Sequence, residues 1–182
     1  SVEAVVLSPQ AATEASITMP DSVTTIGQRA FYDCKALKQL TLPENLTDIG
    51  AYAFSGCLGL QNVTLPEKLA TIAEHAFDYT GLTAIHIPAS VTMIGQQALS
   101  QNYDLLKITV GEASTVYCAE DNVLYNKEKT MLIRAGSGLS GDWSIPFGVK
   151  TVEAMAFWNC WTLETLRIPA TVQSIGQIDM LG

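Results

Sequence analysis

Apolar and polar positions alternate along this chain in a pattern that repeats about every 23 residues. Prolines at positions 20, 43, 66, 88, 146 and 169 mark the start of each copy, and their spacings are 23, 23, 22, 58 and 23. A full copy reads PENLTDIGAYAFSGCLGLQNVTL, and the sixth copy, PATVQSIGQIDMLG, is truncated. Recurrence at a fixed period identifies a repeat architecture.

Each copy predicts two extended pieces joined by a turn. The L-x-x-L-x-L run, residues 60–65 in the second copy, ends in strict alternation, which predicts a short strand with one buried face. Proline then ends the strand. The V/L-T-x-I run, residues 46–49, predicts a second and shorter extended piece. Ala53 and Phe54 follow it, and we expect them in a helical or 3₁₀ turn that points inward.

One repeat cannot fold alone. It supplies about eight apolar side chains, each contributing ~1.5–3 kcal/mol when fully buried. Ordering its backbone costs roughly 1–2 kcal/mol per residue. The free energy becomes favourable only when neighbouring repeats stack and share a core. The pattern therefore predicts a solenoid with a parallel strand ladder, made mostly of strands and loops with little helix.

We expect a single domain over residues 1–182, with repeats starting at the six prolines and an N-terminal cap at residues 1–19. Ile17-Thr18-Met19 is expected to supply a strand, and Val5-Val6-Leu7 to cover the first core layer. At the other end, Asp179 and Met180 replace the Ala and Phe of the pattern. An unpaired carboxylate is costly in a core, so the solenoid is expected to end or be capped there.

The 58-residue spacing contains an insertion, residues 111–145, with Gly111 standing where a proline would fall. Its two apolar runs, residues 123–125 and 131–133, predict the strands of a β-hairpin joined by residues 126–130. Glu120, Asp121 and Asn122 lack the spacing of a calcium-binding loop, and we interpret them as a turn.

The pattern I-P-x-S-V-T-x-I-G-x-x-A-F-x-x-C-x-x-L-x-x-V-x-I-P, nearly complete in residues 42–66, resembles the BspA-type leucine-rich repeat, also called the TpLRR class. The segment EDNVLYNKEKTMLIRA resembles the hairpin that commonly interrupts these arrays. The resemblance covers about 160 residues. It implies a right-handed α/β-type leucine-rich-repeat solenoid, and a secreted or surface-displayed microbial protein. It further implies adhesion or partner binding without catalysis.

Charge narrows the set of partners. Ten basic residues against eighteen acidic ones give a net charge of −8, and no basic run is present. We therefore expect no binding to nucleic acid, which requires clustered Lys and Arg. No stretch approaches the roughly 18 consecutive apolar residues that span a bilayer, so we expect no membrane insertion within this segment. The chain starts at Ser1 without a charged and then apolar leader, as expected of a mature or trimmed chain.

Three of the four cysteines, Cys34, Cys57 and Cys160, share one repeat position, and Cys118 lies outside the repeat. The chain has no C-x-x-C pair, so the usual zinc and redox spacings are missing. Buried thiols are favoured, because Thr80 and Asn102 fill the same position without a bridge. A disulfide between the cysteines of the first two copies remains geometrically open.

No residue set predicts catalysis, a cofactor or a metal. The glycine position of the repeat also holds Ala73 and Glu153, so we interpret it as a tight turn and not as a phosphate cradle. His75 and His86 have no second histidine at metal spacing and no Ser/Asp partners, and we interpret both as surface residues.

The outward side of the strand ladder is the candidate binding surface, since solenoids bind partners through such extended faces. The alternative is that these are ordinary solvated strand residues. A second candidate is an aromatic patch of Trp143, Trp158 and Trp161, which could bind a partner or a sugar ring, or could instead cover the insertion's hairpin. The predicted ladder residues are Gln39, Thr41, Asn62, Thr64, Ala84, His86, Lys107, Thr109, Thr165 and Arg167.

These observations predict a non-enzymatic adhesion module that engages a protein or carbohydrate partner of a host or matrix. The alternative is a structural spacer within a longer surface protein.

Overall fold

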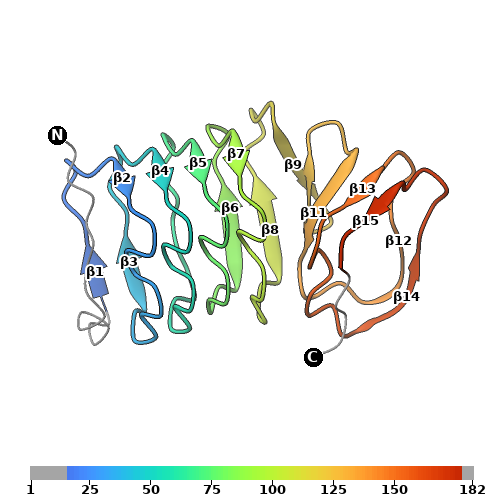
Figure 1. The fold of residues 1–182 in the computed structure, drawn as a ribbon, viewed down its shortest axis with the longest axis horizontal. Helices are drawn as coiled ribbons and strands as arrows, with labels where there is room; N and C mark the ends of the chain where they lie inside the picture. Colours follow the sequence, from blue (N-terminus) through green and yellow to red (C-terminus); the bar gives the residue numbers. More distant parts are fainter. Residues whose placement is uncertain (1–15, 178–182) are drawn as a thin grey trace.

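The computed structural model describes residues 16–177, which wind into an elongated solenoid (Figure 1). We call its regular turns coil 1 (20–42), coil 2 (43–65), coil 3 (66–87), coil 4 (88–110) and coil 5 (146–168). The predicted cap residues before 16 and the predicted end at 179–180 lie outside the described residues. Within that range the chain forms strands and turns and no helix, so the Ala-Phe segments are turns where a helical or 3₁₀ turn was expected.

Strands of three to five residues form one row along the solenoid, which we call the long-strand row. They pair in parallel as β1 with β3, β6 with β8, and β12 with β14. Strand β1 confirms the strand expected near Ile17. The row comprises β1 (Ser16–Thr18), β3 (Gln39–Thr41), β6 (Ala84–Ile87), β8 (Lys107–Val110), β12 (Gly141–Ser144) and β14 (Leu163–Arg167).

Strands of two residues from the V/L-T-x-I runs form a second row, the short-strand row, and the five-residue strand β11 of the insertion joins it. The order β2-β4-β5-β7 is parallel throughout and joins coils 1 to 4. Further along, β11 pairs in parallel with β13, and β13 with β15. These strands are β2 (Thr25–Ile26), β4 (Asp48–Ile49), β5 (Thr71–Ile72), β7 (Met93–Ile94), β11 (Met131–Ala135), β13 (Thr151–Val152) and β15 (Ser174–Ile175).

The insertion contains the predicted hairpin and more. Strand β10 (Val123–Asn126) pairs antiparallel with β11, which confirms the hairpin. A third strand, β9 (Tyr117–Glu120), was not predicted and pairs with the other edge of β10. Asp121 and Asn122 join β9 to β10 with φ of 50° and 61°, as expected for a two-residue type I′ turn. Strand β11 lies in the short-strand row and β12 in the long-strand row, so residues 131–144 form a shortened coil.

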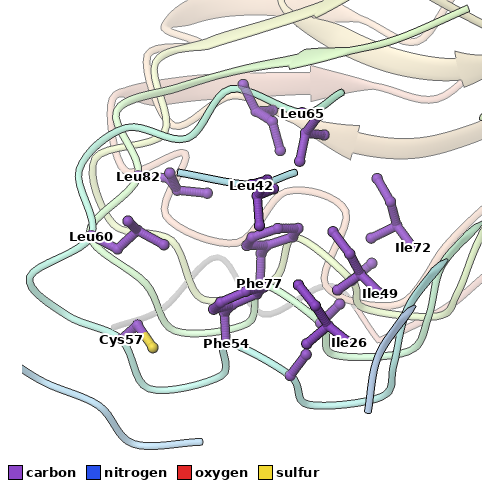
Figure 2. Close-up of a cluster of buried hydrophobic side chains, with 14 of the residues drawn as sticks. Ile26, Leu42, Ile49, Phe54, Cys57, Leu60, Leu65, Ile72, Phe77 and Leu82 are labelled. Atoms are coloured by element: carbon purple, nitrogen blue, oxygen red, sulfur yellow. The ribbon is translucent and has the colours of Figure 1, made fainter. Parts of the chain in front are cut away.

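Stacked phenylalanines form the centre of the core. The rings of Phe31, Phe54 and Phe77 lie parallel, with centroids 5.1 and 5.2 Å apart. Figure 2 shows the rings of Phe54 and Phe77 against each other, with Ile26, Ile49 and Ile72 of the short-strand row on one side and Leu60 and Leu82 on the other. The repeat period sets this geometry, because each position falls on its counterpart in the next coil.

The turn between the two rows uses two left-handed residues per coil. Arg29 and Asp33 in coil 1 have φ of 57° and 60°, and Gln97 and Gln101 in coil 4 have φ of 54° and 53°. In coil 1 the amide of Ala30 donates to the carbonyl of Gly27, which is the i+3 to i bond of a β-turn. A left-handed residue at the third position is typical of type II turns, which favour glycine there.

Glycine at the glycine position of the repeat is explained by close packing between coils and not by a left-handed conformation. Gly50 is not left-handed, but an added Cβ would lie 2.7 Å from the backbone nitrogen of Gln28 in the preceding coil. At Gly95 the corresponding distance, to the nitrogen of Glu74, is 2.2 Å. Close approach of neighbouring coils therefore favours glycine at these two positions, while coil 3 accommodates Ala73 with the same backbone hydrogen bond. Glu153 occupies the same position where the preceding element is β11, whose Leu132 carbonyl accepts its amide.

Candidate binding face

The exposed side of the long-strand row, which we call the ladder face, carries all ten predicted residues. Eight of them have exposed side chains, while Ala84 and Thr109 are half-buried. Alternation explains their orientation, since Ile85 and Ile87 of β6 are buried and His86 between them is exposed. Their role in binding stays a prediction.

Two neighbouring hollows run along this face. One, of about 640 Å³, lies between residues 38–41 and 61–64. The other, of about 310 Å³, lies between residues 62–64, 84–86 and the side chains of Lys107 and Thr109. Eight of the ten predicted residues line one or both hollows, and Thr165 and Arg167 lie beyond them on β14. The hollows share Asn62, Val63 and Thr64, so they form one shallow trough over coils 1 to 4.

The trough arises where the strand row opens. Residues 61–65 of coil 2 form no strand, although their sequence has the same alternation as β3 and β6. One backbone hydrogen bond joins this segment to a neighbouring coil within residues 16–177: the amide of Thr83 donates to the carbonyl of Gln61 over 3.0 Å. The backbone groups of residues 62–64 are therefore open to a ligand that can donate and accept hydrogen bonds.

Polar contacts along the ladder face are local and exposed. His86 Nδ1 lies 2.9 Å from Thr109 Oγ1 on the paired strand. Arg167 donates from Nη2 to Asp142 Oδ2 over 3.0 Å. A hydrogen bond from Thr165, and then the one from Arg167, lower the pKa of Asp142 below its usual value. Asp142 belongs to β12 and was missed by the sequence reasoning, because GDWS has no leucine-repeat signature.

The three tryptophans of the predicted aromatic patch differ in exposure. Trp143 packs edge-on against the buried Phe157, with ring centroids 5.8 Å apart, and Trp158 is half-buried. Binding a partner and covering the hairpin stay alternative predictions for these residues. Trp161 is 60% exposed and contacts Tyr103, with centroids 6.2 Å apart.

The repeat cysteines are buried free thiols. Cys57 donates from Sγ to the carbonyl of Phe31 in the preceding coil, over 3.1 Å. Asn102, at the same position of coil 4, donates from Nδ2 to the carbonyl of Phe77 over 2.9 Å. Burial raises the pKa of the Cys57 thiol to about 12, so this thiol stays protonated and is a poor nucleophile. This position thus supplies a buried donor, which packing arguments alone did not predict.

His75 is not a simple surface residue. Its ring stacks on Tyr52 at 4.6 Å, and Nδ1 lies 3.2 Å from Asp78 Oδ2. Burial raises the pKa of Asp78, while the neighbouring His75 opposes that shift. Residues 16–177 contain no group of three or more His, Cys, Asp or Glu side chains placed to hold a metal ion.

Arg134, on β11 of the insertion, is a buried residue that the sequence reasoning missed. Its side chain is 2% exposed, and Nη1 donates to the carbonyls of Met155, Ala156 and Trp158 at 3.0, 3.3 and 2.9 Å. In regular coils the backbone amides of the preceding turn bind such carbonyls, as when Phe54 donates to Ala76. Ala156 keeps its regular donor, the amide of Ala135 at 2.7 Å, and Met155 accepts the amide of Trp158. The guanidinium therefore replaces a backbone donor at the carbonyl of Trp158, whose counterpart Asp78 accepts the amide of Gly56 in the regular coils.

No part of residues 16–177 forms a helix with the length and apolar character needed to cross a bilayer.

A family model described as the BspA type leucine rich repeat region matches residues 11–130 and 140–178 in six copies. No curated protein was found to match the sequence.

Several crystal structures are similar. A leucine-rich repeat protein from Eubacterium ventriosum is 34% identical over 90% of this chain, with a TM-score of 0.84. A leucine rich cell surface protein from Faecalibacterium prausnitzii is 33% identical over 89%, with a TM-score of 0.72. The pneumococcal vaccine antigen PcpA is 25% identical over 90%, with a TM-score of 0.81. The chain covers 44%, 56% and 47% of these three proteins, about half of their length.

Proposed function

Because the chain belongs to the BspA-type leucine-rich repeat family, we propose that it is a non-enzymatic binding module, secreted or displayed at the cell surface. It engages a protein or glycan partner along the ladder face. The trough over coils 1 to 4 carries this proposal, since it gathers eight of the ten ladder residues and leaves backbone groups of residues 62–64 unpaired.

The character of the surface supports recognition of a polar partner. The trough is lined by amide, hydroxyl, imidazole and ammonium groups, and it presents them from several coils at a regular spacing. Extended faces of this kind are used by solenoids to bind macromolecules. The Faecalibacterium relative is a cell surface protein, which supports display outside the cell.

A double variant, Thr64→Arg with His86→Glu, tests the proposal. Both side chains are exposed, so the changes alter the trough and leave the core intact. We expect binding to immobilised host-matrix proteins to weaken by roughly tenfold or more, as for central interface residues. Surface plasmon resonance would measure the change.

The matched control is Thr92→Arg with Gln96→Glu, which introduces the same two residues at exposed positions of the short-strand side. It should bind as the wild type does. Equal binding by wild type and the ladder variant would exclude the ladder face. Absence of binding by the wild type to every matrix protein and glycan would favour a spacer role instead.

A further inference from the structure

A line of exposed aromatic side chains follows one corner of the solenoid, outside the ladder face. In coils 4 and 5 the residue directly after the buried cysteine position is Tyr103 or Trp161, and their side chains are 42% and 60% exposed. Coil 3 is one residue shorter and lacks this position. In coil 3 Thr80 stands at the cysteine position, and the exposed aromatic residue is Tyr79 directly before it, which is 39% exposed.

The three rings touch one another across coils. The centroids of Tyr79 and Tyr103 are 5.8 Å apart with the rings 66° to each other, and those of Tyr103 and Trp161 are 6.2 Å apart at 58°. We call Tyr79, Tyr103 and Trp161 the aromatic ridge. Its rings follow at a nearly constant interval, so the ridge presents a repeating series of ring faces and edges.

The insertion does not interrupt the ridge, although it separates Tyr103 from Trp161 in sequence. Where the shortened coil passes this corner, the chain has Gly136, Ser137 and Gly138, which carry little or no side chain. Ser137 donates its amide to the carbonyl of Leu105, which fixes this segment against coil 4. Small residues there leave room for the two large rings to meet.

The shape of the ridge distinguishes among partners. Helices and proline-rich peptides bind in grooves, and protein hot spots fill pockets. The main hollows of the described surface lie elsewhere, along the trough and between residues 96–97, 151–154 and Ser174. Exposed aromatic rings on a corner suit a ligand that needs only a ring face. The C–H face of a pyranose is such a ligand, with hydroxyls at its rim that remain in water.

Charge selects among glycans. Asp104 directly follows Tyr103, and Glu164 lies three residues after Trp161; both are exposed. Their carboxylates can accept hydrogen bonds from sugar hydroxyls and repel uronic acids or sulfated sugars. The net charge of −8 acts in the same direction. We propose that the aromatic ridge is a second binding site, which takes a neutral linear glycan by stacking successive sugar rings on Tyr79, Tyr103 and Trp161.

Affinity electrophoresis tests this site. Wild-type protein is run in native gels that contain a soluble β-glucan, a mannan or, as the anionic comparison, polygalacturonate. We expect slower migration with at least one neutral polysaccharide and none with polygalacturonate. Trp161→Leu keeps an apolar side chain but removes the ring, and should weaken binding by roughly tenfold. Trp161→Phe keeps a ring and should retain most of the binding.

Met93→Ala removes another exposed apolar side chain far from the ridge and should bind as the wild type does. Circular dichroism melts verify that each variant is folded, and Tyr103→Leu provides a second, independent ring deletion. The proposal is overturned by equal binding of Trp161→Leu and wild type, by no retardation in any neutral polysaccharide, or by retardation in polygalacturonate alone. The ladder variant, Thr64→Arg with His86→Glu, should bind the neutral polysaccharide normally, so failure of one site is distinguishable from failure of the other.

Discussion

Single side chains of the phenylalanine stack have little freedom to adjust when a neighbour is lost. Phe54 is fully buried between Phe31 and Phe77, with both rings within 5.2 Å of its own. The backbone of each coil is hydrogen-bonded to the next, so the coils cannot move together to fill a gap.

We therefore expect Phe54→Ala to lower the free energy of unfolding by ~3–5 kcal/mol, which is the usual range for a buried phenylalanine. Chemical denaturation would measure it, with Leu58→Ala as an exposed control on the same coil. A loss below ~1 kcal/mol would show that the stack can relax.

The residues of this core could be predicted because each occurs once per period. Five copies of the pattern separate positions that must be apolar from positions that vary. Arg134 could not be predicted in this way, since it occurs once and in a segment with no second copy. Its role depends on which carbonyls lie opposite, and that is a property of the fold.

At the scale of elements, the turns store backbone strain. Left-handed conformations cost a non-glycine residue roughly 1–2 kcal/mol, and coils 1, 3, 4 and 5 each contain two such residues outside glycine. Coil 2 has Gly56 at the second of these positions, with φ of 81°. The same turn is therefore compatible with glycine.

Gln101→Gly should consequently raise the free energy of unfolding, by about 0.5–1 kcal/mol after the extra entropy of glycine in the unfolded chain is counted. Gln96→Gly, at an exposed position that is not left-handed, should lower it. Thermal melts of both variants would measure the difference. Destabilisation by both to the same extent would mean that the turn at Gln101 is not strained.

The sequence predicted the strands that carry the repeat and missed those that do not. Strand β12 contains Gly141 and no alternating apolar pair at its start, and it forms because β14 supplies its hydrogen-bond partners. The reverse holds for residues 61–65, which have the strand pattern and no strand pairing. Alternation of apolar and polar residues therefore predicted which side chains face outward. The trough could not be predicted, because it depends on which neighbouring coils pair through their backbones.

At the scale of the whole molecule, the insertion joins two cores. Leu124 of β10 packs with the core of coils 1 to 4, and its neighbours Val123 and Tyr125 pack with the core of coil 5. The hairpin is thus apolar on both faces. Arg134 adds a polar contact to the second side, through three carbonyls of coil 5.

Arg134→Met removes these hydrogen bonds and keeps the apolar stem. We expect a loss of ~1–3 kcal/mol in the free energy of unfolding, since the carbonyl of Trp158 is left without a donor, while those of Met155 and Ala156 keep the amides of Trp158 and Ala135. Hydrogen exchange should locate the effect at the junction of β11 and coil 5. Arg167→Met, which breaks only the exposed ion pair with Asp142, should cost less than ~1 kcal/mol. Equal losses for the two variants would mean that the buried guanidinium contributes no more than a surface one.

The substitution of a backbone donor by Arg134 has a consequence for how such arrays can be recombined. The carbonyl of Trp158 is one that any regular coil presents, as Asp78 does to Gly56, so a hairpin that carries its own guanidinium can be set before coil 5 without redesign of the downstream sequence. Residues 111–145 should therefore be transferable as a unit. Grafted between two coils of a related array, they should leave the array folded when Arg134 is present and destabilise it when Arg134 is replaced.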